Sequence, residues 1–354
     1  NMQLSEKTKN SLKGVMPITK EEREDALASA CMQVKRVLPE FTTKFQNAYS
    51  ENGFYRPIDN VEWTTGFWTG EIWLAYEYGG EDVLLKAAEI QMQDFLHRIE
   101  QKICVDHHDM GFLYTPSCVA GYKLTGSGTG KRAALLAASQ ETGDESYRQI
   151  ADRHVHTTLE NVIRPDFSTW HTFFFDPVTG NPDHGATCQG YRDGSAWARG
   201  QAWGIYGTAL AYRYTKREEY KYIFRGVSKY YIEHLPKDLV PYWDLEFSDG
   251  DAQPRDSSSA SIAACGMLEM AKYLYDEEAA FYRDLAEKFI GSVYRNYAVK
   301  DFEKSNGIVL HSTYSNRSPY NTCNPCGVDE CNSWGDYFYM EALTRLQKDW
   351  QIYW

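Results

Sequence analysis

The stretch Asp193-Gly-Ser-Ala-Trp-Ala-Arg-Gly-Gln-Ala-Trp203 leads directly into the apolar pattern of a helix. A second stretch, Asp106-His-His-Asp-Met-Gly-Phe-Leu-Tyr114, leads into another aromatic-rich helical pattern. Both place acidic and small residues where a helix begins, so their polar groups are expected to line a cleft at one end of a helical bundle. Aromatic rings beside those polar groups offer a stacking surface for sugars. The two stretches therefore predict a carbohydrate-active enzyme.

Helical periodicity recurs along the rest of the chain. Small, aromatic-rich helices are predicted at 65–78, 110–126, 200–214, 257–275 and 334–346. Polar amphipathic helices are predicted between them, at 82–100, 145–162, 218–234 and 278–297. This alternation indicates an inner ring of helices wrapped by an outer ring. The alternating run Trp170–Asp176, followed by the turn residues Pro177-Val-Thr-Gly180, predicts a hairpin arm over the cleft. The predicted fold class is all-α with short β-like arms.

Composition limits the classes of partner. The chain has 354 residues and a formal net charge of −12, which argues against a basic footprint for nucleic acid. No apolar stretch is long enough to span a bilayer, and the first seven residues lack an apolar leader pattern. We therefore expect no membrane partner and a cytoplasmic location. Because no linker-like tract divides the chain, we expect a single domain over 1–354.

Three cysteines near the C-terminus, Cys323, Cys326 and Cys331, have the spacing C-x2-C-x4-C. A structural zinc site needs a fourth ligand and usually a second close pair of ligands. Reduced loop thiols are therefore the favoured interpretation and a zinc site is the alternative. We expect neither a metal nor an organic cofactor.

Several long motifs, in order, resemble the unsaturated glucuronyl hydrolases, glycoside hydrolase family 88. The resemblance covers about 60–346, and its motifs are Glu62-Trp-Thr-Thr-Gly-Phe-Trp68, Asp106–Tyr114, Trp170-His-Thr-Phe173, Gly185-Ala-Thr-Cys-Gln-Gly190, Trp197–Trp203, Arg255-Asp-Ser-Ser-Ser259 and Trp334-Gly-Asp-Tyr337. It implies an (α/α)6 barrel. It also implies hydration of the C4=C5 double bond in unsaturated uronic-acid disaccharides released by lyases from glycosaminoglycans, with or without sulfate. A carboxyl group protonates C4, water adds at C5, and the hemiketal collapses to an open-chain keto acid.

The resemblance assigns one catalytic residue, Asp109, by its His-His-Asp-Met-Gly-Phe setting. The alternative is a helix cap, because an aspartate before a helix can accept its first N–H groups. The neighbouring His107 is interpreted as structural. A second aspartate is expected in the family at the head of an inner helix, but no residue in 126–143 carries its motif.

The resemblance also assigns substrate-binding residues, namely Trp63, His171, Gly185, Thr187, Gln189, Arg199, Trp203, Ser312, Ser315 and Arg317. A guanidinium at Arg199 suits a uronate carboxylate, and Trp203 one turn later can stack on the sugar ring. The loop from Gly185 to Gln189 can offer N–H groups to an oxyanion. The alternatives are a core Trp–Arg pair, a hydrogen-bonded core histidine at His171, and a solvated loop at 312–317.

The interval from Gly126 to Asp193 is short for its place in the ring. The run Arg132–Ser139 resembles the tail of a third inner helix without its polar head. We therefore expect a chain break, with a Cα–Cα distance well beyond ~3.8 Å, between Ser127 and Gln140. Two functions compete with glucuronyl hydrolysis: unsaturated rhamnogalacturonyl hydrolysis, and sugar binding by an inactive homologue.

Overall fold

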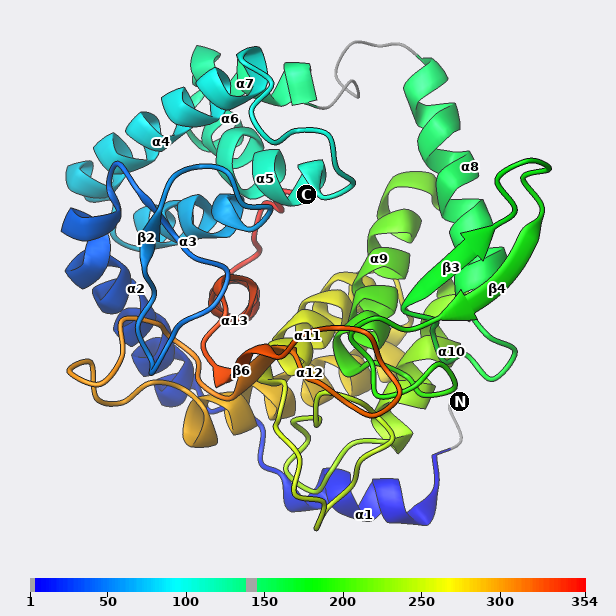
Figure 1. Ribbon diagram of the computed structural model, residues 1–354. Coiled ribbons are helices and arrows are strands. Elements are labelled where there is room, and N and C mark those ends of the chain that lie inside the picture. Colours follow the sequence, from blue (N-terminus) through cyan, green and yellow to red (C-terminus); the bar gives the residue numbers. More distant parts are fainter. Residues whose placement is uncertain (1–3, 138–144) are drawn as a thin grey trace.

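The computed structural model describes residues 4–137 and 145–354. Its helices form two concentric layers (Figure 1). The inner segments are α3 (Thr65–Gly79), the run of α5 (Met110–Tyr114), η1 (Thr115–Val119) and α6 (Ala120–Thr125), α9 (Ala198–Thr215), α11 (Ser257–Ala271) and α13 (Ser333–Gln347). Around them lie α2 (Lys20–Phe41), α4 (Asp82–Glu100), α8 (Glu145–Val162), α10 (Glu218–Glu233) and α12 (Asp276–Asn296). The predicted α/α architecture is confirmed.

Side-chain size explains why the inner helices pack so closely. Every residue of α11 is buried, and most of them are small. A Cβ added at Gly266 would lie 2.7 Å from the Cα of Tyr206 on α9, and one at Gly66 on α3 would lie 2.2 Å from the carbonyl oxygen of Phe112. Only glycine lets the backbones approach to this distance. By contrast, α10 buries one face and exposes the other, as an outer helix should.

Helix α7 (Gly128–Ala137) contains most of the run that the sequence assigns to the tail of a third inner helix. Ser127 begins it, because the hydroxyl of Ser127 accepts from the N–H of Gly130 over 3.2 Å. The helix contacts the outer helix α4, with an ion pair of 2.5 Å between Arg132 and Glu100, and it also contacts the inner segments η1, α6 and α5. Because α7 contacts both layers, the assignment of Arg132–Ser139 to the tail of a third inner helix stays a prediction.

The predicted chain break is absent from the described part of its interval. The chain is helical from Gly128 to Ala137, and the N–H of Lys131 donates to the carbonyl of Ser127 over 2.9 Å. The remainder of the predicted interval, through Gln140, lies outside the described residues.

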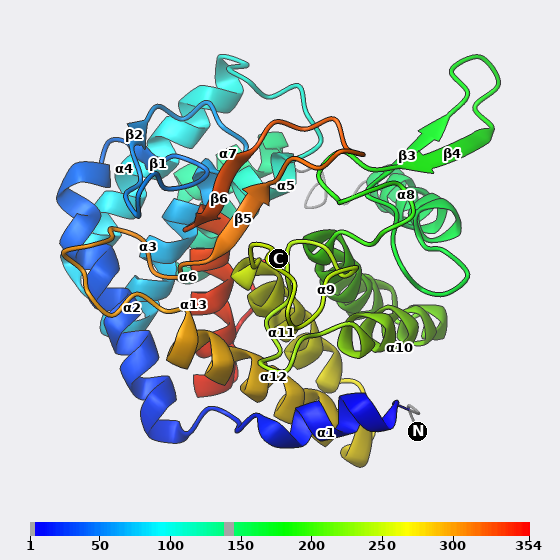
Figure 2. The ribbon, with the colours of Figure 1, turned by 60° about the horizontal axis from the view of Figure 1, so that its bottom comes forward.

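Three short antiparallel hairpins complete the fold. They are β1 (Phe45–Gln46) with β2 (Pro57–Ile58), β3 (Thr172–Phe175) with β4 (Pro182–Ala186), and β5 (Ser312–Ser315) with β6 (Cys326–Glu330). The β3–β4 hairpin confirms the predicted arm, with Phe173 opposite Gly185. Its tip extends away from the barrel, and its base lies near α8 and α9 (Figure 2). The base, and not the tip, therefore carries His171 toward the inner helices.

The C-terminal segment after α13 packs against the inner helices (Figure 1). The Trp354 indole stacks on Phe338 with ring centroids 5.8 Å apart, and its Nε1 donates to Glu341 over 2.8 Å. Tyr353 and Trp350 both donate to the carboxylate of Glu77 near the end of α3. The segment thus ties α13 to α3.

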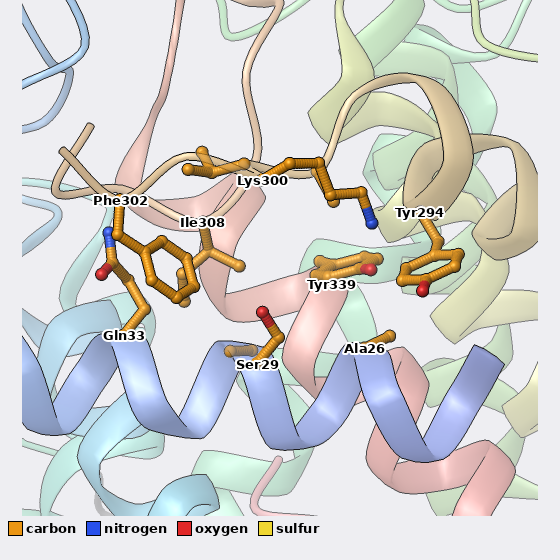
Figure 3. Close-up of a pocket in the computed structure, with 11 residues that line it drawn as sticks. Ala26, Ser29, Gln33, Tyr294, Lys300, Phe302, Ile308 and Tyr339 are labelled. Carbon is orange, nitrogen blue, oxygen red and sulfur yellow. The ribbon is translucent and has the colours of Figure 1, made fainter. Parts of the chain in front are cut away.

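A small cavity lies between α2 and the loop that follows α12, with Gln33, Tyr294, Lys300 and Tyr339 among its lining residues (Figure 3). None of the predicted site residues lines it. Within the described residues, no helix combines the length and apolar character needed to cross a membrane.

Candidate active site

Four of the eleven predicted site residues lie at or near the starts of inner helices, and the other seven lie in or beside the β3–β4 and β5–β6 hairpins. Asp109 immediately precedes α5, Arg199 is the second residue of α9, and Trp203 lies one turn further along that helix. Trp63 lies two residues before the first residue of α3, next to its N-cap residue Thr64. Asp256, at the N-cap of α11, joins them although it was not predicted as a site residue.

Aromatic side chains connect these starts. The Phe112 ring lies 5.9 Å from the Trp63 ring and 5.3 Å from the Trp203 ring, so it links the two tryptophans. Trp63 also stacks on Trp334 at 5.3 Å and 24°, and its Nε1 donates to the hydroxyl of Tyr314 over 3.1 Å. Trp63 and Trp203 are only half-buried, which leaves part of each ring free to contact a sugar.

Asp109 keeps its carboxylate available. Among the described residues its side chain makes no capping hydrogen bond to α5, and it is 22% exposed. The backbone N–H of Asp109 donates instead to Nδ1 of His107 over 3.1 Å, and Nε2 of His108 lies 3.4 Å from the carboxylate. The capping alternative is therefore wrong, and His107 has the structural role expected of it.

His171 is held as a neutral ring. Its Nδ1 accepts from the backbone N–H groups of Cys188, over 2.8 Å, and Gln189, over 3.1 Å. An atom that accepts carries no proton, so the ring proton is on Nε2. Burial, reinforced by the positive charge of Arg199, lowers the pKa of His171 to about 4. The imidazole can therefore present a fixed N–H donor at neutral pH.

The backbone N–H groups of the loop after β4 donate to acceptors within the protein. The N–H of Thr187 donates to Asp193, and the N–H of Gly190 donates to the Thr187 hydroxyl over 2.8 Å. The N–H groups of Cys188 and Gln189 go to His171. The N–H groups of Thr187, Cys188 and Gln189 are therefore not free for an oxyanion, which contradicts the expectation at these three positions. Gly185 has a steric role, because a Cβ there would lie 2.0 Å from the Trp170 ring.

Arg199 is fully buried and saturated with partners. Its Nη1 donates to Asp256 over 2.5 Å and to the carbonyl of Thr313. Its Nη2 donates to Oε1 of Gln189 over 2.9 Å and to the carbonyl of Tyr314. Burial raises the pKa of the Asp256 carboxyl, although the adjacent guanidinium opposes that shift. All four N–H groups on the two Nη atoms of Arg199 thus donate to acceptors within the protein. The group that Arg199 orients and that can still donate is the amide nitrogen of Gln189.

The guanidinium also lies between two indole rings. The Cζ of Arg199 is 4.4 Å from the Trp197 ring centroid and 4.9 Å from that of Trp334. These cation–π contacts stabilise a charge that burial would otherwise disfavour.

The three predicted substrate-binding residues Ser312, Ser315 and Arg317 differ in access. Ser312 is fully buried in β5, and its hydroxyl lies 2.8 Å from that of Ser257. The Ser315 hydroxyl donates to the carbonyl of Asn324 over 2.6 Å. Arg317 is exposed, and one Nη donates to the carbonyl of Cys323 over 3.1 Å. Only Arg317 of the three presents a free surface.

The cysteines are free thiols, all eight of them. Cys323 donates to the carbonyl of Asn316, and Cys326 lies 3.2 Å from the Ser315 hydroxyl. Within 4–137 and 145–354, no group of three His, Cys, Asp or Glu side chains is arranged to hold a metal ion. The zinc alternative at Cys323, Cys326 and Cys331 therefore has no support in the described structure.

Sequence reasoning missed several residues that build the site, namely Phe112, Trp197, Asp256, Tyr314 and Trp334. The sequence indicated that Asp256 lies at a helix start, because an aspartate before a run of serines often precedes a helix. It did not indicate that Asp256 pairs with Arg199, since the two residues are far apart in the sequence.

An α/α barrel with aromatic rings, an available carboxylate and oriented donors at the inner-helix starts is an architecture suited to carbohydrate chemistry. No protein-family model matches the chain. A protein of Streptococcus pneumoniae named unsaturated chondroitin disaccharide hydrolase is 41% identical over 381 aligned positions, which take in 95% of each chain. A Bacillus protein named unsaturated glucuronyl hydrolase is 32% identical over 94% of this chain and 98% of the relative. The chain belongs to the unsaturated glucuronyl hydrolase family.

Solved structures agree with this assignment. The crystal structure of unsaturated glucuronyl hydrolase from Streptococcus agalactiae matches with a TM-score of 0.93 and 38% identity over the whole of both chains. The Bacillus structure matches with a TM-score of 0.87 and 32% identity over 92% of this chain and 97% of the other. The alignment with the S. pneumoniae relative spans 381 positions, more than the 354 residues of this chain, so that relative carries residues without a counterpart here.

Proposed function

We propose that this chain hydrolyses unsaturated glucuronyl disaccharides by adding water across the C4=C5 bond of the uronic acid. The family membership carries this proposal. Protonation of an electron-rich enol ether needs a positioned carboxyl group and water, and requires no cofactor. The available carboxylate of Asp109, three residues before the Phe112 ring that links Trp63 and Trp203, is consistent with that chemistry.

Each residue has a proposed role. Asp109 acts on the reacting C4–C5 bond as one member of the carboxyl pair that the family uses. Trp63 and Trp203 stack on the sugars, while His171 and Gln189 donate hydrogen bonds to the uronate. Thr187 and Gly185 hold the Gln189 loop, and Arg199 orients its side chain.

The proposed substrate class is an unsaturated disaccharide from a sulfated glycosaminoglycan. A variant of the S. agalactiae enzyme has been solved in complex with the disaccharide dGlcA-GalNAc6S. Arg317 supplies an exposed guanidinium that suits a sulfate group, whereas Ser312 and Ser315 shape the strand beneath it. The names of the relatives favour glucuronyl over rhamnogalacturonyl substrates. A cytoplasmic location stays a prediction, which cell fractionation would test.

The reaction in D2O tests the chemistry. Hydration on the enzyme delivers one solvent deuterium to a single face of C4 before the glycosidic bond opens. Displacement at the anomeric carbon first releases a uronate with an intact double bond and an unlabelled C4, and its later ring opening and tautomerisation in solution place deuterium on both faces of C4. Proton NMR of the product from an unsaturated chondroitin disaccharide distinguishes the two. An unlabelled, still unsaturated uronate would contradict the proposal.

A second candidate function is sugar binding without turnover. It is favoured by the aligned length, which exceeds the length of this chain, and by the absence of the motif for the second aspartate in 126–143. A chain that lacks one member of a catalytic carboxyl pair would retain the stacking surface and lose most of its rate. Calorimetric binding of the disaccharide with an unchanged ultraviolet absorbance would identify this outcome.

A further inference from the structure

Asp256 is a fully buried carboxylate that belongs to no assigned role. It occupies the N-cap of α11, yet within the described structure its side chain does not cap that helix. One carboxylate oxygen accepts from Arg199 over 2.5 Å, and the other accepts from the Ser258 hydroxyl. The carboxylate therefore joins two separate groups of side chains.

The first branch leads to Gln189. Arg199, held by Asp256, donates through Nη2 to Oε1 of Gln189 over 2.9 Å. An amide whose oxygen is held in this way must direct its two N–H donors elsewhere. The orientation of the Gln189 amide therefore depends on the position of the guanidinium.

The second branch leads to Trp63. The Ser258 hydroxyl that donates to Asp256 also accepts from Nε1 of Trp334 over 3.1 Å. The Trp334 ring stacks on Trp63 at 5.3 Å. A cross-link closes the network, because Arg199 also donates to the carbonyl of Tyr314, whose hydroxyl accepts from Trp63 over 3.1 Å.

We infer that Asp256 is a positioning residue of the sugar site, which sets the Gln189 amide through Arg199 and the plane of the Trp63 ring through Ser258 and Trp334. The inference rests on the proposed function, since it takes Gln189 and Trp63 as sugar contacts. A buried arginine that loses its counter-charge must find another partner or become hydrated. Either change moves the guanidinium away from Gln189.

The test measures binding in the absence of turnover. In an Asp109→Asn background, the dissociation constant of an unsaturated chondroitin disaccharide is measured by calorimetry with and without Asp256→Asn. We expect Asp256→Asn to weaken binding about tenfold, the effect of misplacing one hydrogen-bond donor and one stacking ring.

Glu269→Gln is the matched control. Glu269 is a fully buried carboxylate further along the same helix, and it accepts from Arg213 and Arg345, each over 2.8 Å. Both substitutions remove a charge from a buried ion pair, so both should lower the melting temperature. Only Asp256→Asn should change the dissociation constant. Equal binding by the two folded variants would overturn the inference.

A double-mutant cycle with Gln189→Ala separates positioning from general damage. If Asp256 acts partly through Gln189, its substitution should cost less in the Gln189→Ala background than alone. Strictly additive losses would contradict the first branch. Absence of any disaccharide binding by Asp109→Asn itself would count against the proposed function instead, so the two failures are distinguishable.

Discussion

The backbone N–H of Gln189 donates to Nδ1 of His171, while the side chain of the same glutamine accepts from Arg199. One residue thus fixes the ring proton of the histidine on Nε2 and is itself fixed by a buried guanidinium. Two donors at the base of the β3–β4 hairpin are consequently oriented before any sugar arrives. Such preorganisation reduces the cost of ordering the site on binding.

His171 should titrate far below an ordinary histidine. Its pKa is lowered to about 4 by burial and by Arg199, so the ring is neutral throughout the neutral range. The folded state binds this proton less readily than the unfolded state. The stability that depends on the neutral ring is therefore complete above pH ~6.5 and is lost as the pH falls toward 4.

Proton NMR of the imidazole C–H signals measures this directly, and the protein contains its own comparison. The 2.6 Å hydrogen bond from His311 to Asp329 raises the pKa of His311, so its signal should titrate above that of an ordinary histidine. A His171 midpoint near ~6.5 would contradict the lowered pKa of this buried ring.

Substituting Asp109 by Asn should lower turnover by roughly 100-fold or more, the loss typical of a positioned acid–base group. The KM and the melting temperature should change little, because within the described residues the carboxylate does not cap α5. Steady-state kinetics and thermal unfolding measure both effects. The control is Asp106→Asn, an exposed carboxylate three residues earlier. Near-normal turnover of Asp109→Asn would remove Asp109 from the mechanism.

Trp203 should contribute to affinity through its ring. Trp203→Ala should weaken disaccharide binding by about 0.5–1.5 kcal/mol, the worth of one aromatic stacking contact. Trp203→Phe should recover part of the loss, because Phe112 and Phe338 still pack on a ring at this position. Titration calorimetry of the two variants provides the comparison. An affinity unchanged in Trp203→Ala would restore the alternative of a core Trp–Arg pair.

Trp354 should matter for stability. It packs on Phe338, Phe112 and Tyr206 and donates to the buried Glu341. Trp354→Ala should therefore lower the free energy of unfolding by about 2–3 kcal/mol, somewhat below the cost for a fully buried tryptophan. Urea denaturation measures it, with Tyr320→Ala as a control at a ring that is 62% exposed. Equal small losses would show that the C-terminal segment does not support the barrel.

The sequence predicted the two rings of helices because apolar spacing is a local property of each helix. The place of the run beginning at Arg132 stays a prediction, because a short apolar run fits the head and the tail of a helix equally well. Ser127 was the available sign of a helix start, whereas the contacts of α7 with both layers are tertiary contacts. The loop from Gly185 showed its composition but not the destination of its N–H groups, since the contact with His171 depends on how the hairpin pairs. The pairing of Asp256 with Arg199 was missed because 57 residues separate them.

The measurement that tests the central claim most directly follows ultraviolet absorbance of the conjugated C4=C5 uronate with disaccharide in large excess over protein. A hydrolase removes the absorbance of many equivalents of substrate per protein, and Asp109→Asn slows that loss sharply. The account predicts this result. Absorbance that stays constant, or falls by no more than one equivalent while calorimetry shows binding, would contradict it and make this chain a sugar-binding member of its family.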